Sequence, residues 1–355
     1  MSGDVLKVLA AGDHFVRPGA VAEAIRAELG GRASVRELTG PWPIEPFGPV
    51  AEVHEASGDE DELIAALDGA EVAVTQMAPF TERVLAAAPA LRLVVVTRGG
   101  PVNVNLAAAE ARGVEVRSTP GRNAPAAAEL AVALTLGALR RLAQVDATMR
   151  AGEWRSDLYA YDACGGELSG AEVGVVGFGA IGRRVAAVFE ALGARVLVHD
   201  PFAAPPPSME QVKLPDLLAR SRVVSLHARL TPETRHMIGA SELALMPRDA
   251  VLVNTARGAL VDTEALTEAL TSGRLAGAAL DVYDPEPLPA DHPLRALPNV
   301  LLTPHLAGAT RQTADRAVAM AAREVAAYYA ATRQGRDEGR DESRDQGRDR
   351  EGRTA

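Results

Sequence analysis

Several kinds of residue are scarce in this chain of 355 residues, and each scarcity excludes a class of protein. A single cysteine, Cys164, excludes an internal disulfide framework and gives no cluster of metal ligands. No apolar run reaches the roughly 18–20 residues that span a bilayer, and the start lacks the pattern of a secretory signal. The net charge of −10 argues against nucleic acid as the main partner. We therefore expect a cytoplasmic protein without a membrane partner, a nucleic-acid partner or a metal.

What remains is the composition of a globular protein, with 47% hydrophobic and 24% charged residues. The length is enough for two domains of ordinary size, each with its own core. The stretch from Arg333 onward differs, because it lacks apolar residues that could form a core and its seven arginines balance seven acidic residues. We expect a disordered charged tail over residues 333–355, which is either a dispensable extension or a partner-binding segment.

Short apolar runs alternate with helical patterns along the rest of the chain. In the first part these runs occupy residues 5–11, 34–38, 71–75, 91–97 and 114–118, with helical patterns at 20–29 and 79–89. Later runs occupy residues 172–177, 194–200, 222–227, 250–256, 276–282 and 299–305. Continuous apolar strands separated by helices predict parallel sheets that are covered on both faces. The sequence therefore predicts an α/β protein with two doubly wound parallel-sheet domains, the second of them six-stranded.

Two helical patterns indicate how the chain passes between these domains. A long pattern runs over residues 123–152, directly after the turn-rich stretch "STPGRN", which is a suitable domain junction. A second pattern, over residues 311–332, is expected to return to the first domain. The prediction is therefore two crossovers and a cleft between the domains.

The stretch "VGVVGFGAIGRRVA" contains the pattern G-x-G-x-x-G at Gly177, Gly179 and Gly182. An apolar strand precedes it and a helical pattern follows, which is the context of a dinucleotide-binding turn. The first glycine would permit the tight turn, the second a close approach to a pyrophosphate, and the third close helix–strand packing. The alternative is a glycine-rich turn with a purely structural role.

Residues around this turn suggest which dinucleotide it binds. The amides near Ala180 and Ile181 would donate to phosphate at the positive end of the helix. Asp200 ends the next strand, 18 residues beyond Gly182, and would accept hydrogen bonds from the adenosine ribose. Because an acidic side chain there repels a 2′-phosphate, NAD is favoured over NADP.

Three functional residues follow the ends of later strands, and ligands of open α/β sheets bind along that edge. Arg257 offers a planar fork of donors for a carboxylate and an adjacent carbonyl. His305 can exchange a proton near neutral pH, and Glu286 beside it would orient the ring as a general acid requires. Taken singly, they could instead be a surface cation, a core histidine and a loop charge.

The chain resembles the D-isomer-specific 2-hydroxyacid dehydrogenase family from about residue 5 to residue 330, in the manner of phosphoglycerate dehydrogenases and glyoxylate or hydroxypyruvate reductases. The resemblance is carried, in order, by "RGGPVNVNLAAAEARGVEV", "RAGEW", "ELSGAEVGVVGFGAIGRRVA", "LHARLTPETRHMIG", "MPRDAVLVNTARGALVD", "GAALDVYDPEPLP" and "LLTPHLAGAT". It implies an NAD-dependent oxidoreductase that interconverts a small D-2-hydroxy acid and its 2-oxo acid by hydride transfer.

The resemblance also assigns roles to residues. It implies that Arg257 binds the substrate carboxylate and polarises its carbonyl, and that His305, paired with Glu286, is the general acid/base. Asp281 is expected to contact the nicotinamide. The rest of the cofactor site would be lined by His227, Ala228, Thr255, Ala256 and Gly308. The expected domains are a flavodoxin-like substrate-binding domain over residues 1–117 and 306–332 and a Rossmann NAD-binding domain over residues 118–305.

Departures from the family pattern bear on substrate and cofactor. The loop "TQMAPFT" carries Gln76 and Met77 where phosphoglycerate-oxidising members commonly place an arginine, so a phosphorylated substrate loses its natural anchor. Amides near Gly99 and Gly100 could still hold a carboxylate, and Arg98 could add charge. In the stretch "LHARLT", Arg229 replaces a common proline near the expected adenosine site. Because an arginine there could contact a 2′-phosphate, it weakens the preference for NAD, although Asp200 outweighs it.

Two further interpretations concern partners. The family is usually dimeric, so we expect a homodimer formed by the long helix and the region after "RAGEW". Tyr159 and Tyr161 are then interface aromatics or reach a substrate pocket. An alternative function on the same scaffold is an NAD(H)-sensing, corepressor-like binding protein. A different Rossmann dehydrogenase would require Arg257, Glu286 and His305 to lie apart.

Overall fold

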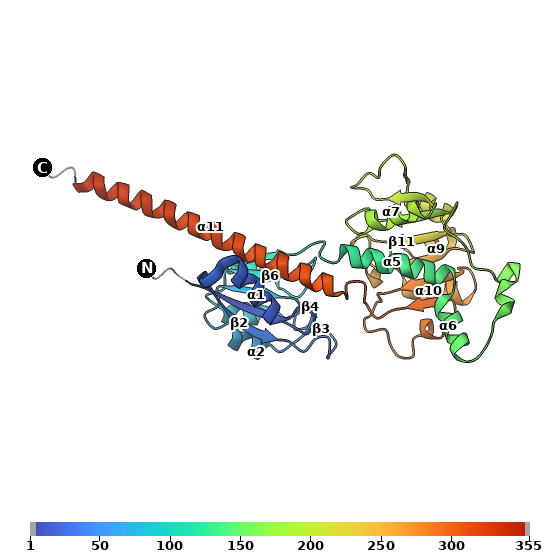
Figure 1. The fold of residues 1–355 in the computed structure, drawn as a ribbon, viewed down its shortest axis with the longest axis horizontal. Helices are drawn as coiled ribbons and strands as arrows, with labels where there is room; N and C mark the ends of the chain where they lie inside the picture. Colours follow the sequence, from blue (N-terminus) through green and yellow to red (C-terminus); the bar gives the residue numbers. More distant parts are fainter. Residues whose placement is uncertain (1–4, 352–355) are drawn as a thin grey trace. The chain divides into compact units, whose positions relative to one another are not determined.

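The computed structural model describes residues 5–351, and it describes side chains as far as residue 332. The chain forms two compact units (Figure 1). Unit 1 contains the chain up to Arg122 and again from Thr310, and unit 2 contains Asn123–Ala309. Among the described residues, no helix has both the length and the apolar character needed to cross a membrane. The tail predicted over residues 333–355 lies outside the residues whose side chains are described, so that prediction stays a prediction.

Unit 1 is built around a five-stranded parallel sheet whose strands coincide with the five apolar runs of the first part. The strand order is β2-β1-β5-β6-β7, which is the flavodoxin-like order once the hairpin strands β3 and β4 are set aside. The strands are β1 (Leu6–Gly12), β2 (Ala33–Thr39), β3 (Gly48–Val50), β4 (Val53–Ala56), β5 (Val72–Thr75), β6 (Leu93–Val96) and β7 (Glu115–Ser118). The helices are α1 (Pro18–Leu29), α2 (Glu60–Ala66), α3 (Glu82–Ala87), α4 (Leu106–Ala111) and α11 (Arg311–Glu351).

Both faces of this sheet are buried, as its continuous apolar strands require. In β6, Val94 and Val96 belong to one core cluster, whereas Leu93 and Val95 belong to the other. Helix α11 contributes Ala317, Ala321 and Val325 to the second cluster and packs beside α1 (Figure 1). The helical pattern after His305 therefore completes the core of unit 1.

Unit 2 contains a seven-stranded parallel sheet with the order β10-β9-β8-β11-β12-β13-β14. Counted along the chain this is 3-2-1-4-5-6-7, the Rossmann order with one strand added. The prediction of six strands is wrong because it omits β10, which comprises two exposed polar residues and therefore carries no apolar signal. The strands are β8 (Glu172–Val176), β9 (Arg195–His199), β10 (Glu210–Gln211), β11 (Val223–Leu226), β12 (Val251–Asn254), β13 (Gly277–Leu280) and β14 (Val300–Leu302).

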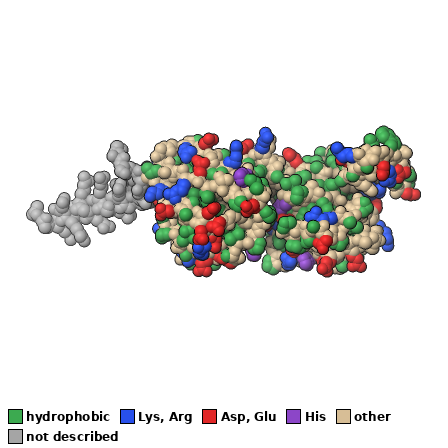
Figure 2. Space-filling view, turned by 90° about the horizontal axis from the view of Figure 1, so that it is seen from below, with side chains coloured by type: hydrophobic (Ala, Val, Ile, Leu, Met, Phe, Trp, Pro, Cys, Tyr) green, Lys and Arg blue, Asp and Glu red, His purple; other side chains and the backbone are tan. Residues whose placement is uncertain are grey.

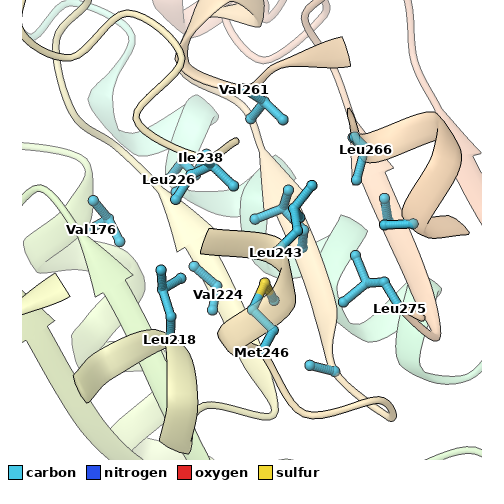
Figure 3. Packing of buried hydrophobic residues seen from close by; sticks show 14 of the residues in the cluster. Val176, Leu218, Val224, Leu226, Ile238, Leu243, Met246, Val261, Leu266 and Leu275 are labelled. Atoms are coloured by element: carbon cyan, nitrogen blue, oxygen red, sulfur yellow. The ribbon is translucent and has the colours of Figure 1, made fainter. Parts of the chain in front are cut away.

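The core of unit 2 also lies on both faces of its sheet. One cluster combines Val224 and Leu226 of β11 with Leu243 of α9 and Leu266 of α10 (Figure 3). The other contains Val223, which points to the opposite face of β11. The helices are α5 (Ala124–Leu139), α6 (Leu142–Arg150), α7 (Gly182–Ala191), α8 (Leu214–Arg220), α9 (Ala240–Leu245) and α10 (Thr263–Thr271). Every residue of β11, β12 and β13 is buried, as a sheet that is covered on both faces requires.

The single helical pattern over residues 123–152 forms two helices instead of one. The break falls at Arg141, whose backbone is left-handed with φ 51°. Helix α5 packs on the sheet through Ala131, Leu134 and Leu139, whereas α6 has no buried residue. Neither proline nor glycine stands at position 141 or beside it, so the sequence pattern predicts one uninterrupted helix.

Candidate active site and dinucleotide site

The predicted residues of unit 2 emerge from one edge of its sheet. Parallel pairing sets five strand ends in register, namely Val176, Leu226, Asn254, Leu280 and Leu302. The residues that follow these ends therefore share the C-terminal edge, where ligands of open α/β sheets bind. They are Gly177, His227, Thr255, Asp281 and Thr303.

The three glycines of the fingerprint have different surroundings. Gly177 has φ 93°, and a Cβ there would lie 2.6 Å from the backbone nitrogen of Ala228. A Cβ on Gly182 would collide with the carbonyl oxygen of Gly177, so helix α7 could not start so close to the strand. Gly179 instead faces open space, with nothing within 4 Å of a built Cβ. Two glycines are thus required by packing, while the third leaves room for a ligand, as a dinucleotide turn requires.

Asp200 ties the end of β9 to this turn. Its carboxylate accepts hydrogen bonds from the backbone amides of Phe178 (2.6 Å), Phe202 (2.7 Å) and Ala203 (3.0 Å). Burial raises the pKa of the Asp200 carboxyl, but the three amide donors outweigh burial and the net pKa is lowered. A negative charge is therefore held beside the glycine-rich turn. Ala180 is exposed there, and Ile181 is the N-cap of α7.

The ends of β11 and β12 add a neutral imidazole and an unsatisfied hydroxyl. Nε2 of His227 forms a hydrogen bond with Oγ of Ser225 at 2.9 Å. Desolvation lowers the pKa of His227 to about 4, although the residue keeps some exposed surface. Thr255 is 7% exposed, and its buried Oγ1 has no hydrogen-bond partner among the described residues. Ala256 follows it and is half-buried. A buried hydroxyl without a protein partner fits an edge that holds a polar ligand.

His305 and Glu286 form the central pair. Nδ1 of His305 lies 2.8 Å from Oε2 of Glu286, and Oε1 of Glu286 accepts from the amide of Tyr283 at 2.9 Å. Burial raises the pKa of Glu286, but its bonds to His305 and Tyr283 and the charges of His305 and Arg257 bring the net pKa below its usual value. Because a carboxylate only accepts, Nδ1 carries the proton that is donated to Glu286, which is the tautomer that proton exchange through Nε2 requires.

Arg257 follows β12 and lies close enough to this pair for the charges to interact. Its Nη1 donates to the carbonyl of Ala256 at 2.7 Å. Although the residue keeps an exposed surface, desolvation lowers the pKa of its guanidinium, and the charge of Glu286 opposes that shift. Glycine is required at Gly258, because a Cβ would collide with the backbone of Tyr283. This close approach brings Arg257 to the loop that carries Glu286, so the three residues do not lie apart.

Asp281 and Gly308 stand beside the turn that carries His305. Asp281 is 0% exposed, and its carboxylate accepts from donors on residues 303–307. Its expected contact with the nicotinamide stays a prediction. A Cβ on Gly308 would make an ordinary contact of 3.5 Å with Asn123, so packing does not require glycine there.

The predicted substrate residues lie in unit 1, after β5 and β6. Gln76 and Met77 are 3% and 5% exposed. At Gly99 and Gly100 a Cβ would point into open space, with nothing within 4 Å. Arg98 forms an ion pair with Glu55, donates to the carbonyl of Glu55 at 3.1 Å and contacts Sδ of Met77 at 3.4 Å. The positive charge in this loop is therefore matched by a carboxylate.

Sequence reasoning missed Glu55 and Tyr283. Glu55 lies 43 residues before Arg98 and has a left-handed backbone with φ 46°, which no local pattern indicates. Tyr283 lies within the stretch "DVYDPEP", where nothing in the sequence indicates a partner for its hydroxyl. Among the described residues, no group of three or more His, Cys, Asp or Glu side chains could hold a metal ion.

Comparisons with known proteins agree with this edge chemistry. Residues 132–307 match the model of the "D-isomer specific 2-hydroxyacid dehydrogenase, NAD binding domain". The chain is 44% identical over 251 residues to a glyoxylate reductase of Aeropyrum pernix, which covers 69% of this chain and 75% of that protein. It is 39% identical over 302 residues to a D-3-phosphoglycerate dehydrogenase of Mycobacterium leprae, covering 84% of this chain but only 53% of that protein. The chain thus spans about half the length of this second relative.

The fold is also shared with solved structures. A D-lactate dehydrogenase from Lactobacillus jensenii, solved with NAD+, superposes with a TM-score of 0.72 at 26% identity. The superposition covers 90% of this chain and 95% of that one. The predicted architecture, a Rossmann NAD-binding domain with a second α/β domain, is therefore confirmed.

Proposed function

Because this chain belongs to the D-isomer specific 2-hydroxyacid dehydrogenases, which are NAD-dependent oxidoreductases, we propose that Arg257, Glu286 and His305 are its catalytic residues. The enzyme interconverts a small D-2-hydroxy acid and its 2-oxo acid. The observation that carries the proposal is the 2.8 Å contact between Nδ1 of His305 and the carboxylate of Glu286. It orients the ring as a histidine that exchanges protons through Nε2 requires.

The three residues divide the work according to their chemistry. Arg257 binds the substrate carboxylate with its planar donors and polarises the neighbouring carbonyl. His305 protonates the keto oxygen during reduction and removes the hydroxyl proton during oxidation, while Glu286 stabilises the imidazolium. The hydride chemistry is what NAD supplies when it is bound.

We propose that the turn with Gly177, Gly179 and Gly182 holds the pyrophosphate of NAD, with help from the amides of Ala180 and Ile181. The open space at Gly179 and the charge held at Asp200 support this assignment. In the same proposal, the cofactor is further contacted by His227, Ala228, Thr255, Ala256, Asp281 and Gly308.

The substrate is proposed to be a small 2-oxo acid without a phosphate. Gln76, Met77, Gly99 and Gly100 would line its binding loops, and none of them carries charge. Arg98 is engaged by Glu55, so it offers no unbalanced cation for a phosphate. The relatives include both a glyoxylate reductase and a D-3-phosphoglycerate dehydrogenase, and the uncharged loop favours the substrate class of the first.

A homodimer is proposed because large apolar or aromatic side chains within residues 142–161 of unit 2 are exposed. The exposed fractions are 56% for Leu142, 81% for Trp154, 92% for Tyr159 and 93% for Tyr161. In the space-filling view, acidic and basic side chains are interspersed over the displayed face of each unit (Figure 2). Exposed aromatics on a surface of mixed charge favour an interface between protein chains.

The corepressor-like alternative does not hold. The relatives named above are a glyoxylate reductase and a D-3-phosphoglycerate dehydrogenase. The dehydrogenase family model matches residues 132–307, which include Arg257, Glu286 and His305. The function is therefore catalytic.

The direct test is consumption of NADH, followed by its absorbance, with a panel of 2-oxo acids. The panel consists of glyoxylate, hydroxypyruvate, a branched 2-oxo acid and 3-phosphohydroxypyruvate, each with NADH and with NADPH. We expect steady turnover of an unphosphorylated acid with NADH and a lower kcat/KM for the phosphorylated one. No turnover of any 2-oxo acid would contradict the proposed function, and a preference for the phosphorylated acid would contradict the substrate class.

A further inference from the structure

His305 has a backbone conformation that a histidine rarely adopts. Its φ is 55°, in the left-handed region, and it lies in a turn over residues 303–307 just after β14. For a residue with a side chain this conformation costs free energy, so the surrounding structure has to hold it in place. The question is which groups hold the turn.

Asp281, at the end of the neighbouring strand β13, bonds to the turn on both sides of His305. Its carboxylate accepts from Oγ1 of Thr303 (2.6 Å), from the amide of Leu306 (2.8 Å) and from the amide of Ala307 (2.8 Å). Its carbonyl accepts from the amide of His305 itself at 2.8 Å. Asp281 is 0% exposed, and the three bonds that end on its carboxylate are charge-assisted bonds, which are strong where water is excluded.

Tyr283 joins the same turn to the loop that carries Glu286. Its hydroxyl lies 2.8 Å from the carbonyl of Thr303 and 3.0 Å from the carbonyl of Leu280, so it donates at the junction of β13 and the turn. Its backbone amide donates to Oε1 of Glu286 at 2.9 Å. Burial raises the pKa of Tyr283 to about 12, and the phenol therefore stays a donor.

We propose that Asp281 and Tyr283 are positioning residues for the acid/base chemistry, because they hold the two halves of the His305–Glu286 pair in one fixed geometry. Asp281 fixes the turn that carries His305. Tyr283 connects that turn to Glu286, through its hydroxyl on one side and its backbone amide on the other. The inference rests on the proposed role of His305. This positioning role differs from the proposed contact of Asp281 with the cofactor, because it depends on the hydrogen bonds that Asp281 and Tyr283 make to the turn over residues 303–307.

The test removes single donors rather than the buried carboxylate, so that folding is preserved. Tyr283→Phe deletes only the hydroxyl. Thr303→Val deletes the hydroxyl that bonds to Asp281 and keeps the branched shape, whereas Thr303→Ser retains the donor. Each variant is assayed for reduction of the best 2-oxo acid of the panel, with KM for NADH and the pH profile of kcat/KM measured alongside.

We expect kcat to fall about fivefold in Tyr283→Phe and in Thr303→Val, the loss that one hydrogen bond allows. KM for NADH should stay within about twofold, because the reacting geometry and not cofactor binding is disturbed. The midpoint of the pH profile should move to lower pH, since a carboxylate held less closely stabilises the imidazolium less. Thr303→Ser should recover most of the rate.

Three outcomes would overturn the inference. The first is wild-type kcat and an unshifted pH profile in both Tyr283→Phe and Thr303→Val. The second is an equal loss in Thr303→Val and Thr303→Ser, which would indicate packing and not the donor. The third is a change confined to KM for NADH. A fully active His305→Ala would instead overturn the proposed function, so the two failures are distinguishable.

Discussion

Units 1 and 2 have the same kind of parallel sheet, yet the loops at their C-terminal edges differ in charge. Unit 2 brings three ionisable side chains together there, with His305 and Glu286 in direct contact. In unit 1 the loops after β5 and β6 present Gln76 and Met77, and Arg98 in the second of these loops is matched by Glu55. This difference supports our proposal that unit 2 supplies proton transfer, and it leads us to propose that the uncharged loops of unit 1 select the substrate.

The largest expected effect is on proton transfer in unit 2. His305→Ala should lower kcat by about 10²–10⁴-fold, the usual contribution of a general acid, while NADH still binds. Gln76→Ala in unit 1 is the matched variant, and it should change mainly KM for the 2-oxo acid. Steady-state kinetics and NADH fluorescence titration measure both. If Gln76→Ala lost kcat as severely as His305→Ala, the division of labour between the units would be wrong.

A smaller effect is expected on the choice between NADH and NADPH, which we assign to Asp200 in unit 2. Asp200→Ala removes the carboxylate and its bonds to the glycine-rich turn, and KM for NADH should rise about 10- to 100-fold. Asp200→Asn loses the charge but keeps one acceptor oxygen, which can serve either Phe178 or the pair Phe202 and Ala203. It should therefore change the ratio of KM for NADH to KM for NADPH. The assignment fails if both variants alter the two cofactors equally.

The features that could be predicted are those written in local patterns. The strands were found because continuous apolar runs are needed where both faces of a sheet are buried. The glycine fingerprint was found because two of its glycines are demanded by contacts between adjacent elements, as at Gly177 and Gly182. His305 and Glu286 were found because the ends of parallel strands meet at one edge.

The missed features depend on tertiary contacts. Strand β10 has two exposed residues and is a strand only because β9 lies beside it. Arg141 breaks a helix whose apolar periodicity runs on without interruption. Glu55 meets Arg98, and Tyr283 meets Thr303, across gaps in the sequence that no spacing rule covers.

The last prediction concerns stability and leaves turnover nearly unchanged. Asp13, in unit 1, is 2% exposed, and its Oδ1 accepts from the amides of Phe15 and Val16. Its Oδ2 is buried without a hydrogen-bond partner among the described residues. Burial raises the pKa of Asp13 from its usual value of 3.8 to about 6, against the opposing effects of those amides and of the charges on Arg122 and His14.

The sign follows from the protons that each state binds. Between pH 4 and 6 the folded state keeps a proton on Asp13 that the unfolded state has released, so stability falls as pH rises through this window. The cost is complete above pH 6 and is on the order of 2–3 kcal/mol. In unit 2 the lowered pKa of His227, about 4, has the opposite sign, because stability is lost as pH falls from about 6.5 towards 4.

Asp13→Asn should therefore stabilise unit 1 at pH 8 and have little effect at pH 4. The amide oxygen of asparagine can still accept from Phe15 and Val16, so the substitution removes the charge and keeps the turn. Urea unfolding in a Trp154→Phe background reports unit 1, since Trp42 then remains as its tryptophan, 5.9 Å from the ring of Phe15. A gain that is equal at both pH values would show that the buried charge is not the cause. It would also remove the contrast in pH dependence between the two units.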